Sequence, residues 1–243
     1  MYKPATDIAI LLFANTATQE AVEKSFVPGT GDANYLIAHT LLNYTTSMLK
    51  EVGLPVIVSS SETQQGSTFG ERLANAFHSA FEAGYQRIIC VGSDCPTLVA
   101  EDIRKASVEL LVHNMVVGPA RDGGAYLIGM HIDYFNPEAF AMLNWQTDEV
   151  LNELTIYSFR QQACMGCLCM LEEKADVDNN ADLKQALQEL PVLSRLKRNL
   201  LAILLKQVKP TVPAHNAAFV LPEIRVREIY LRAPPVQNPL LHL

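Results

Sequence analysis

The chain has 243 residues and a net charge of −7; 49% of its residues are apolar and 19% are charged. This balance is typical of a soluble globular protein, and the length allows one sizeable α/β domain with an extension, or two small domains. No apolar run approaches the roughly 18 residues that span a bilayer, and the first residues lack the apolar segment of a signal peptide, so we expect a cytoplasmic protein.

The charge is unevenly distributed along the chain. Residues 1–193 carry 11 Lys/Arg and 24 Asp/Glu, a net charge of −13, whereas residues 194–243 carry 8 and 2, a net charge of +6. An acidic body of this kind does not bind nucleic acid through backbone electrostatics. We expect the basic tail to dock on the acidic body of its own chain, or of a second copy in a homodimer, in preference to a polyanion.

The first elements are predicted from hydrophobic periodicity. Apolar residues 8–13 predict a central first strand. The loop after it has no glycine before Gly29, which excludes a dinucleotide fingerprint or a P-loop, because both bring backbone amides onto phosphate through glycines. Helical spacing then predicts a helix over residues 32–52, and residues 55–58 predict a second buried strand.

A capping box is predicted at the start of the next helix. The Thr68 side chain can accept a hydrogen bond from an amide of the first turn, while the Glu71 side chain turns back to the backbone at the start of the helix. This helix is predicted to run to Gly84, with Arg72 in its first turn pointing away from the apolar stripe. A strand over residues 87–92 and a helix from about residue 100 to residue 113 follow.

Two loops carry polar residues that can do chemistry. Asp94 follows a strand apolar enough to be buried on both faces, and open α/β sheets bind ligands at the carboxyl ends of such strands. The second loop, residues 118–124, joins two short strands; its paired glycines allow a close backbone approach, and Arg121 and Asp122 offer a donor and an acceptor. Either aspartate can instead cap a helix or stabilise a turn.

The last third of the chain has a different character. We expect a helix toward the end of residues 145–154, an edge strand over residues 164–171 and a short helix over residues 181–190. The odd total of five cysteines favours free thiols; for the cluster Cys164, Cys167 and Cys169 a buried strand is favoured over zinc binding or redox chemistry. Residues 196–208 predict a helix that docks on the body, followed by an extended arm, with a membrane-surface anchor as the alternative.

The order of elements predicts an α/β fold with a mostly parallel sheet and helices on both faces. Five motifs then match a known family in order and rough spacing: GSTFGERL at residues 66–73, VGSDCPT at 91–97, GPARDGGAYLIG at 118–129, WQT at 145–147 and DVDNNADL at 176–183. The chain resembles the glycosyltransferase-A-like bacterial family of uncharacterised proteins related to 2-phospho-lactate guanylyltransferase and molybdenum cofactor guanylyltransferase. The resemblance covers residues 8–190.

This resemblance implies a fold and a site. The fold is the three-layer α/β/α sandwich of nucleotide-diphospho-sugar transferases, with a mostly parallel mixed sheet, over residues 1–190; residues 191–243 would form a basic C-terminal helix and an extended arm. In such folds two aspartates hold Mg²⁺ or Mn²⁺ against the nucleotide's diphosphate, and they map onto Asp94 and Asp178. Two carboxylates suit such an ion, whose other positions are filled by water and phosphate oxygens.

The remaining site residues follow from the same resemblance and from their neighbours in sequence. The nucleotide is expected near Asn15, Lys24, Gln65, Gly66, Arg72 and Ser93. The acceptor or sugar is expected at Arg121, Gly123, Gly124 and Tyr126. Asp122 is a candidate for acceptor binding or for a catalytic base, with a turn-stabilising role as the alternative.

The chain departs from the family pattern after the first strand. Relatives carry a lysine there and a Lys-Thr-Arg cluster a few residues later, whereas this chain has Asn15 and Glu23-Lys24-Ser25. Less positive charge disfavours a nucleoside triphosphate more than a nucleotide sugar. We therefore expect a metal-dependent transferase that uses a nucleotide-activated donor, and glycosyl rather than nucleotidyl transfer. The alternatives are a guanylyltransferase-like nucleotidyltransferase and a degenerate, non-catalytic nucleotide-binding or assembly module.

Overall fold

The computed structural model describes residues 6–160 and 168–206. The chain divides into residues 1–207 and residues 208–243, so everything described belongs to the first unit. Its strands are β1 (Ile8–Ala14), β2 (Val56–Ser60), β3 (Arg87–Val91), β4 (Met115–Pro119), β5 (Ala125–His131) and β6 (Leu168–Met170). Its helices are α1 (Ala17–Glu23), α2 (Gly31–Val52), α3 (Phe69–Glu82), α4 (Ala100–Glu109), the 3₁₀ helix η1 (Ile132–Tyr134), α5 (Pro137–Ala141), α6 (Val150–Arg160), α7 (Asn180–Glu189) and α8 (Arg195–Leu205).

The strands form one mixed sheet in the order β2-β1-β3-β5-β4-β6. The pairs β1–β2, β1–β3 and β4–β6 are parallel, whereas β5 runs antiparallel to both β3 and β4. Because β5 is reversed, its first residues lie at the same edge of the sheet as the carboxyl ends of β1 and β3. The predicted α/β fold with a mostly parallel mixed sheet is confirmed.

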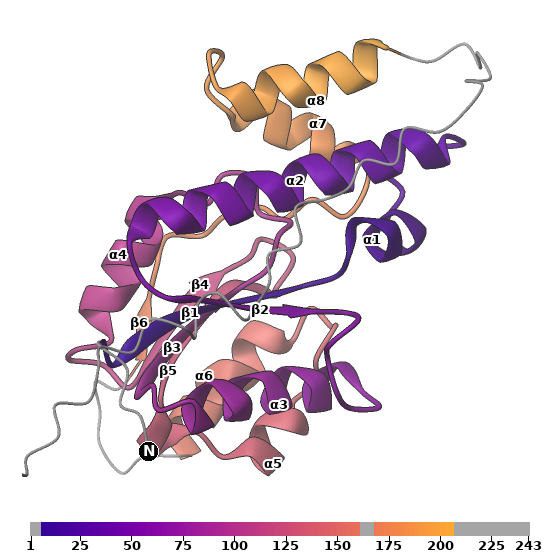
Figure 1. Ribbon diagram of the computed structural model, residues 1–243. Coiled ribbons are helices and arrows are strands. Elements are labelled where there is room, and N and C mark those ends of the chain that lie inside the picture. Colours follow the sequence, from indigo (N-terminus) through magenta and orange to yellow (C-terminus); the bar gives the residue numbers. More distant parts are fainter. Residues whose placement is uncertain (1–5, 161–167, 207–243) are drawn as a thin grey trace, which may run out of the picture. The chain divides into compact units, whose positions relative to one another are not determined.

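Helices cover both faces of the sheet, as Figure 1 shows. On one face, alternate residues of the central strands pack against α3, α5 and α6, with Phe77 and Phe140 fully buried among them. On the other face, the intervening residues pack against α2 and α4, through side chains such as Leu49 and Ile103. Successive side chains of a strand point to opposite faces, which is why continuous apolar runs such as β1 and β3 are buried on both.

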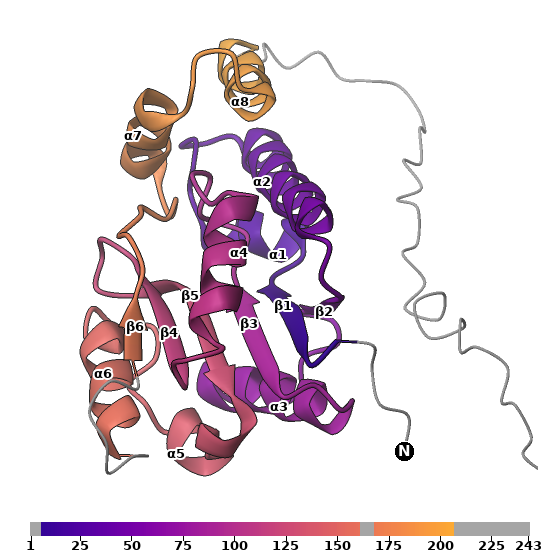
Figure 2. The same ribbon diagram turned by 90° about the vertical axis from the view of Figure 1, so that its left-hand side faces the viewer.

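A third cluster of buried side chains joins α2 to the end of the described chain. Phe26, Ile37 and Leu183 belong to it, together with Leu196 and Leu200 of α8. Figures 1 and 2 show α7 and α8 on the outer side of α2, away from the sheet. The expected docking of the basic helix on the body is confirmed for these two leucines. Among the described residues, no helix has the length and hydropathy needed to cross a membrane.

Several expected elements differ in extent or place. The second strand is an edge strand rather than a buried one, with Val58 45% exposed, because it pairs with β1 alone. The helix expected over residues 100–113 ends at Glu109, although His113 still donates its amide to the Glu109 carbonyl. The helix α1 was not expected; Thr16 caps it by accepting from the Gln19 amide.

Other expectations about the middle and end of the chain are met. Both halves of the capping box at Thr68 are formed, since its side chain accepts from the Glu71 amide and Glu71 accepts from the Thr68 amide. Cys169 lies in the edge strand β6 and is a free thiol; Cys164 and Cys167 lie outside the described residues.

Candidate functional site

A cavity of about 500 Å³ lies at the edge where β1 and β3 end and β5 begins. Phe13 and Ala14 of β1, Val91 of β3 and Ala125 of β5 contribute to its wall. Seven of the residues that line it carry carboxylates, whereas one lining residue, Lys24, is a cation. The carboxylates are those of Glu20, Glu23, Asp94, Asp122, Asp148, Asp176 and Asp178.

Asp94 is held at the carboxyl end of β3, as expected from the sequence. Its backbone carbonyl accepts from the Val177 amide at 2.9 Å, which ties the loop after β3 to the segment that carries Asp178. A Cβ at position 92 would come within 2.8 Å of the Asp94 carboxylate, so Gly92 leaves room for that side chain to turn into the cavity. Ser93 also lines the cavity.

The ammonium group of Lys24 lies among three of these carboxylates. Its Nζ is 2.7 Å from an oxygen of Asp94, 2.7 Å from one of Asp178 and 2.8 Å from one of Glu20. Lys24 follows the last turn of α1, and its side chain is 15% exposed, while those of Asp94 and Asp178 are 31% and 46% exposed. The two predicted metal ligands are therefore brought together, around a cation supplied by the protein itself.

Charge and burial oppose each other at this lysine. Burial alone would lower the pKa of Lys24, but the carboxylates of Asp94, Glu20 and Asp178 raise it well above its usual range. Burial likewise disfavours the charged form of Asp94, yet Lys24 holds the pKa of that carboxyl below its usual value. Both groups are therefore charged at neutral pH, because the opposite charge of each stabilises the charged form of the other.

A third aspartate, Asp176, completes the cluster. One of its oxygens is buried and has no hydrogen-bond partner among the described residues. Burial and the carboxylates of Asp94, Asp122 and Asp178 together raise the pKa of Asp176 to about 8. The sequence reasoning did not select Asp176. The sequence feature that could have identified it is the alternation Asp176-Val177-Asp178. In an extended segment this alternation places the two aspartates on the same side, while Val177 points into the core.

The segment after β1 carries carboxylates where the resemblance led us to expect cations. The amide nitrogen of Asn15 donates to Glu20 at 3.0 Å and to Glu23 at 2.9 Å, so this side chain links the two glutamates to the end of β1. Asn15 and Lys24 both line the cavity, as expected for nucleotide-binding residues, but the local charge is negative.

In the second predicted loop, the residues split between the cavity and the surface. Asp122, Gly124 and Tyr126 line the cavity. Asp122 also accepts from the Gly124 amide at 2.9 Å, so its turn-stabilising role is formed. Gly123 has φ of +90°, and a Cβ there would lie 2.1 Å from the Asp148 carbonyl oxygen, so only glycine fits this turn.

Arg121 and Tyr126 make contacts that the sequence reasoning did not foresee. Arg121 is not among the cavity-lining residues, and its guanidinium donates to Glu189 of α7 at 2.5 Å. The hydroxyl of Tyr126 donates to the Glu172 carbonyl at 2.9 Å, which commits it to the loop after β6. Tyr126 therefore offers the cavity its ring, with its hydroxyl already bonded.

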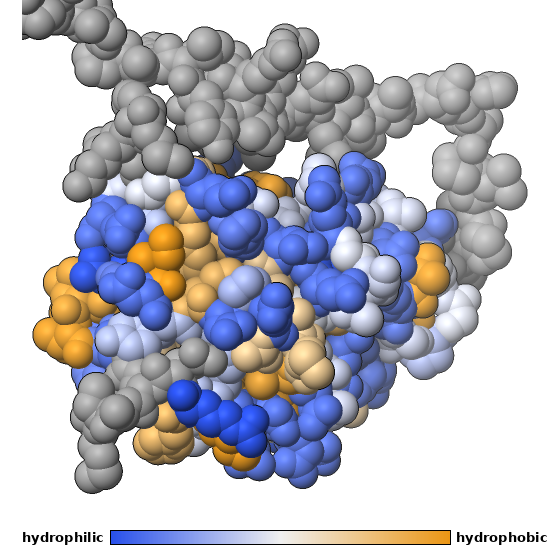
Figure 3. Space-filling view, turned by 90° about the horizontal axis from the view of Figure 1, so that it is seen from below, coloured by the Kyte–Doolittle hydropathy of each residue, from blue (hydrophilic) through white to orange (hydrophobic). Residues whose placement is uncertain are grey.

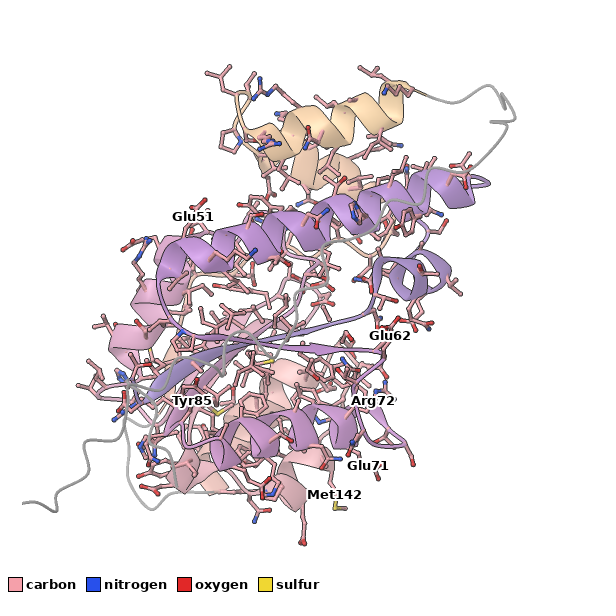
Figure 4. All side chains as sticks on the ribbon, in the orientation of Figure 1. Glu51, Glu62, Glu71, Arg72, Tyr85 and Met142 are labelled. Atoms are coloured by element: carbon pink, nitrogen blue, oxygen red, sulfur yellow. The ribbon has the colours of Figure 1, made fainter. Side chains whose placement is uncertain are left out.

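The loop before α3 lies apart from the cavity wall. Gln65, Gly66 and Arg72 are not among the lining residues. The Gln65 carbonyl accepts from Asn75 at 2.9 Å. Figure 4 shows Arg72 at the amino-terminal end of α3, on the same side of the molecule as Glu62. The expected role of these three residues in nucleotide binding stays a prediction.

One wall of the cavity is aromatic, which the sequence reasoning also did not select. The rings of Phe13 and Phe69 lie 5.6 Å apart at their centroids, and those of Phe69 and Trp145 lie 5.7 Å apart. Trp145 donates its indole N–H to the Phe140 carbonyl at 2.8 Å, which fixes the orientation of its ring. The cavity thus joins an apolar wall to an acidic one. Figure 3 shows the molecule from below, where hydrophobic surface is interspersed with hydrophilic residues.

Comparisons with known proteins support the fold. Residues 46–147 match the model of a family described as "Uncharacterized protein conserved in bacteria (DUF2064)". A structure described as a "putative nucleotide-diphospho-sugar transferase" from Desulfovibrio desulfuricans is similar with a TM-score of 0.72 and 23% identity, covering 83% of this chain and 98% of that one. The expected resemblance is confirmed at this level: a bacterial family of uncharacterised proteins, and the fold of nucleotide-diphospho-sugar transferases.

More distant structures have lower scores. Rv0371c from Mycobacterium tuberculosis, in complex with manganese, has a TM-score of 0.46 and 15% identity, covering 76% of this chain and 100% of that one. CMP:2-keto-3-deoxy-manno-octonic acid synthetase complexed with CTP has a TM-score of 0.40 and 12% identity, covering 75% of this chain and 99% of that one. No curated protein matches the sequence.

Proposed function

We propose that the protein is a metal-dependent transferase that uses a nucleotide-activated donor, and that it transfers a glycosyl group from a nucleotide sugar. The observation that carries the proposal is the convergence of Asp94, Asp176 and Asp178 in one cavity at the carboxyl ends of parallel strands. Ligands of open α/β sheets bind at this edge.

The donor set of the cavity fits Mg²⁺ or Mn²⁺. Carboxylate oxygens are the ligands that these hard cations prefer. Asp94 and Asp178 already surround one positive charge, and the buried oxygen of Asp176 has no partner among the described residues. We therefore assign these three aspartates as the residues that would hold the ion. When bound, it would neutralise charge on the departing diphosphate.

The other residues of the cavity have complementary roles in the proposed reaction. Lys24 and Ser93 would contact the phosphates of the donor, next to the aspartates. The aromatic wall formed by Phe13, Phe69 and Trp145 offers a surface on which a base or sugar ring can pack. Asp122, at the opposite loop of the same cavity, would orient the acceptor and take up the proton of its attacking hydroxyl.

The charge of the cavity favours a nucleotide sugar over a nucleoside triphosphate. Lys24 is already paired with three carboxylates, and Asn15 with Glu20 and Glu23 offers no positive charge in its place. A triphosphate brings more negative charge into this acidic site than the diphosphate of a nucleotide sugar does. Binding should therefore depend on the divalent ion, and more strongly than in a site rich in protein cations.

Titration calorimetry with UDP, GDP and GTP, each with and without Mg²⁺ or Mn²⁺, tests the proposal. The protein should bind a nucleoside diphosphate or nucleotide sugar only in the presence of the ion, and more tightly than GTP. Asp94→Asn should abolish most of this binding. Asp133→Asn is the matched control, because it removes a carboxylate that is not among the cavity-lining residues.

Each other outcome identifies an alternative. Binding that is independent of metal, or unaffected by Asp94→Asn, would remove the metal from the proposal. A clear preference for GTP would favour nucleotidyl transfer. The absence of any metal-dependent nucleotide binding would identify the fold as a degenerate, non-catalytic module.

A further inference from the structure

A second group of metal-ligating side chains lies at the edge of the sheet. Glu109 ends α4, His113 follows it one turn later, and Cys169 is the middle residue of the edge strand β6. One ligand atom of each residue lies within 4.8 Å of those of the other two. None of the three lines the acidic cavity.

The fold brings these three side chains together through two local features. His113 donates its amide to the Glu109 carbonyl at 2.8 Å, so the helical turn continues past α4 and keeps the two side chains on one face. The imidazole Nδ1 of His113 lies 3.1 Å from a Glu109 carboxylate oxygen. Cys169 pairs with Val116 in the parallel β4–β6 ladder and packs against the cluster beneath α4. Figure 2 shows β6 beside β4 at the edge of the sheet.

We propose that Glu109, His113 and Cys169 hold a zinc ion, at a site separate from the Asp94 cavity. Thiolate, imidazole and carboxylate are the three ligand types of protein zinc sites. The Zn–S, Zn–N and Zn–O bond lengths of about 2.0–2.3 Å place tetrahedral ligand atoms about 3.3–3.7 Å apart, so the side chains need to close by only about 1 Å. The thiolate selects zinc over Mg²⁺, which prefers oxygen ligands.

The arrangement also indicates what the zinc would do. All three ligands are partly buried, and three protein ligands leave the fourth position open to water. The strand β6 spans three residues and pairs only with β4, so few backbone contacts hold it. The chain then continues from Cys169 to Asp176 and Asp178 in the cavity. Zinc would fix the start of this segment, whose end carries the carboxylates.

Titration of chelator-treated protein with zinc, in competition with a chromophoric chelator, measures the proposed site. We expect one tightly bound zinc per chain, and at least about a 100-fold loss of affinity in Cys169→Ser and in His113→Ala, since even residues behind the ligands contribute 10–100-fold. Cobalt in place of zinc should give thiolate charge-transfer absorption that Cys169→Ser removes. Bound zinc should raise the melting temperature of the wild type and leave that of Cys169→Ser unchanged.

Matched variants separate this site from other ligands of the chain. His78→Ala is the first control, because His78 and Glu82 also form an i,i+4 pair, at 3.3 Å and with the histidine first, but Cys90, Cys95 and Cys169 do not join it in a metal-ligating group. Asp94→Asn should retain the zinc, which distinguishes this proposal from the function of the cavity. The double variant Cys164→Ser/Cys167→Ser should also retain it.

Three results would overturn the proposal. In the first, Cys169→Ser binds zinc as tightly as the wild type does. In the second, the double variant Cys164→Ser/Cys167→Ser loses its zinc affinity. In the third, the wild type binds zinc no more tightly than His113→Ala does. Melting curves of the metal-free variants, compared with the metal-free wild type, show whether a lost affinity reflects a lost ligand or a lost fold.

Discussion

Lys24→Met should destabilise the protein, and a divalent cation should restore most of the loss. The substitution keeps a long side chain but leaves Asp94, Asp178 and Glu20 without their shared cation. Removal of one partner of a buried ion pair costs about 3–5 kcal/mol, and exposed pairs contribute less than about 1 kcal/mol. Because Lys24 is 15% exposed but Asp178 is 46% exposed, we expect a loss of about 3 kcal/mol.

Two of the carboxylates that lose Lys24, those of Asp94 and Asp178, are also assigned to the metal. An ion present at about 100 times its dissociation constant stabilises the folded state by about 2.7 kcal/mol, which nearly offsets the expected loss. Urea denaturation of Lys24→Met, in EDTA and in Mg²⁺ or Mn²⁺, measures both effects. Divalent cations should shift its midpoint more than that of the wild type, in which the ion competes with the ammonium group.

Lys174→Met is the matched control for this experiment. Lys174 is 13% exposed and pairs with Asp102 at 3.1 Å, and it is not among the cavity-lining residues. Its substitution should also destabilise the fold, but divalent cations should not restore the loss. If Mg²⁺ and Mn²⁺ affect the two variants equally, the carboxylates around Lys24 do not form a cation site, and the reasoning is refuted.

Three further substitutions test parts of the same structure. Asp176→Asn should stabilise the fold by an amount that grows with pH between about 4 and 8 and is constant above, because the folded wild type keeps a proton that its unfolded chain releases near pH 3.8. The rise of the Asp176 pKa to about 8 sets an upper bound of about 6 kcal/mol on this gain. Urea denaturation measures the gain, and a gain that does not depend on pH would contradict the prediction. Gly123→Ala should cost more than about 2 kcal/mol, because φ is +90° and its Cβ would meet the Asp148 carbonyl; thermal melting close to that of the wild type would show that the turn relaxes. Thr68→Ala should cost roughly 1 kcal/mol through loss of the helix cap, and a loss near zero would mean that the cap contributes little.

Local features of the fold could be predicted from the sequence because their causes are local. The apolar runs of β1 and β3, the capping box at Thr68 and the glycine after α2 each depend on residues within one turn or strand. Asp94 was also predictable, since it follows a strand that is buried on both faces. The resemblance placed Asp178 beside it, and the Lys24 contacts with both show that the two lie together.

Other features of the site depend on contacts between distant parts of the chain. Lys24 reaches Asp94 across 70 residues and the Val177 carbonyl across 153, and no local pattern predicts either contact. The buried state of Asp176 depends on how the last segment folds over the cavity. Arg121 was expected at the acceptor because of its neighbours in sequence, but Glu189, 68 residues later, is its partner. The edge position of β2 likewise depends on sheet order.

The internal cation has a consequence for the order of binding. Asp94 and Asp178 with Lys24 retain a net negative charge, and Glu20 shares the same ammonium group. A diphosphate that enters first would meet these carboxylates with a cation that is already paired, which is electrostatically unfavourable. A divalent ion that enters first would instead lower the pKa of Asp176 and offset two of the negative charges that a diphosphate meets. The nucleotide should therefore bind after the ion, and the affinity for the ion should rise with pH up to about 8, since Asp176 must lose its proton to become a ligand. Calorimetric titrations of the nucleotide-free protein with Mg²⁺, between pH 6 and pH 9, measure this dependence, and Asp176→Asn should remove it.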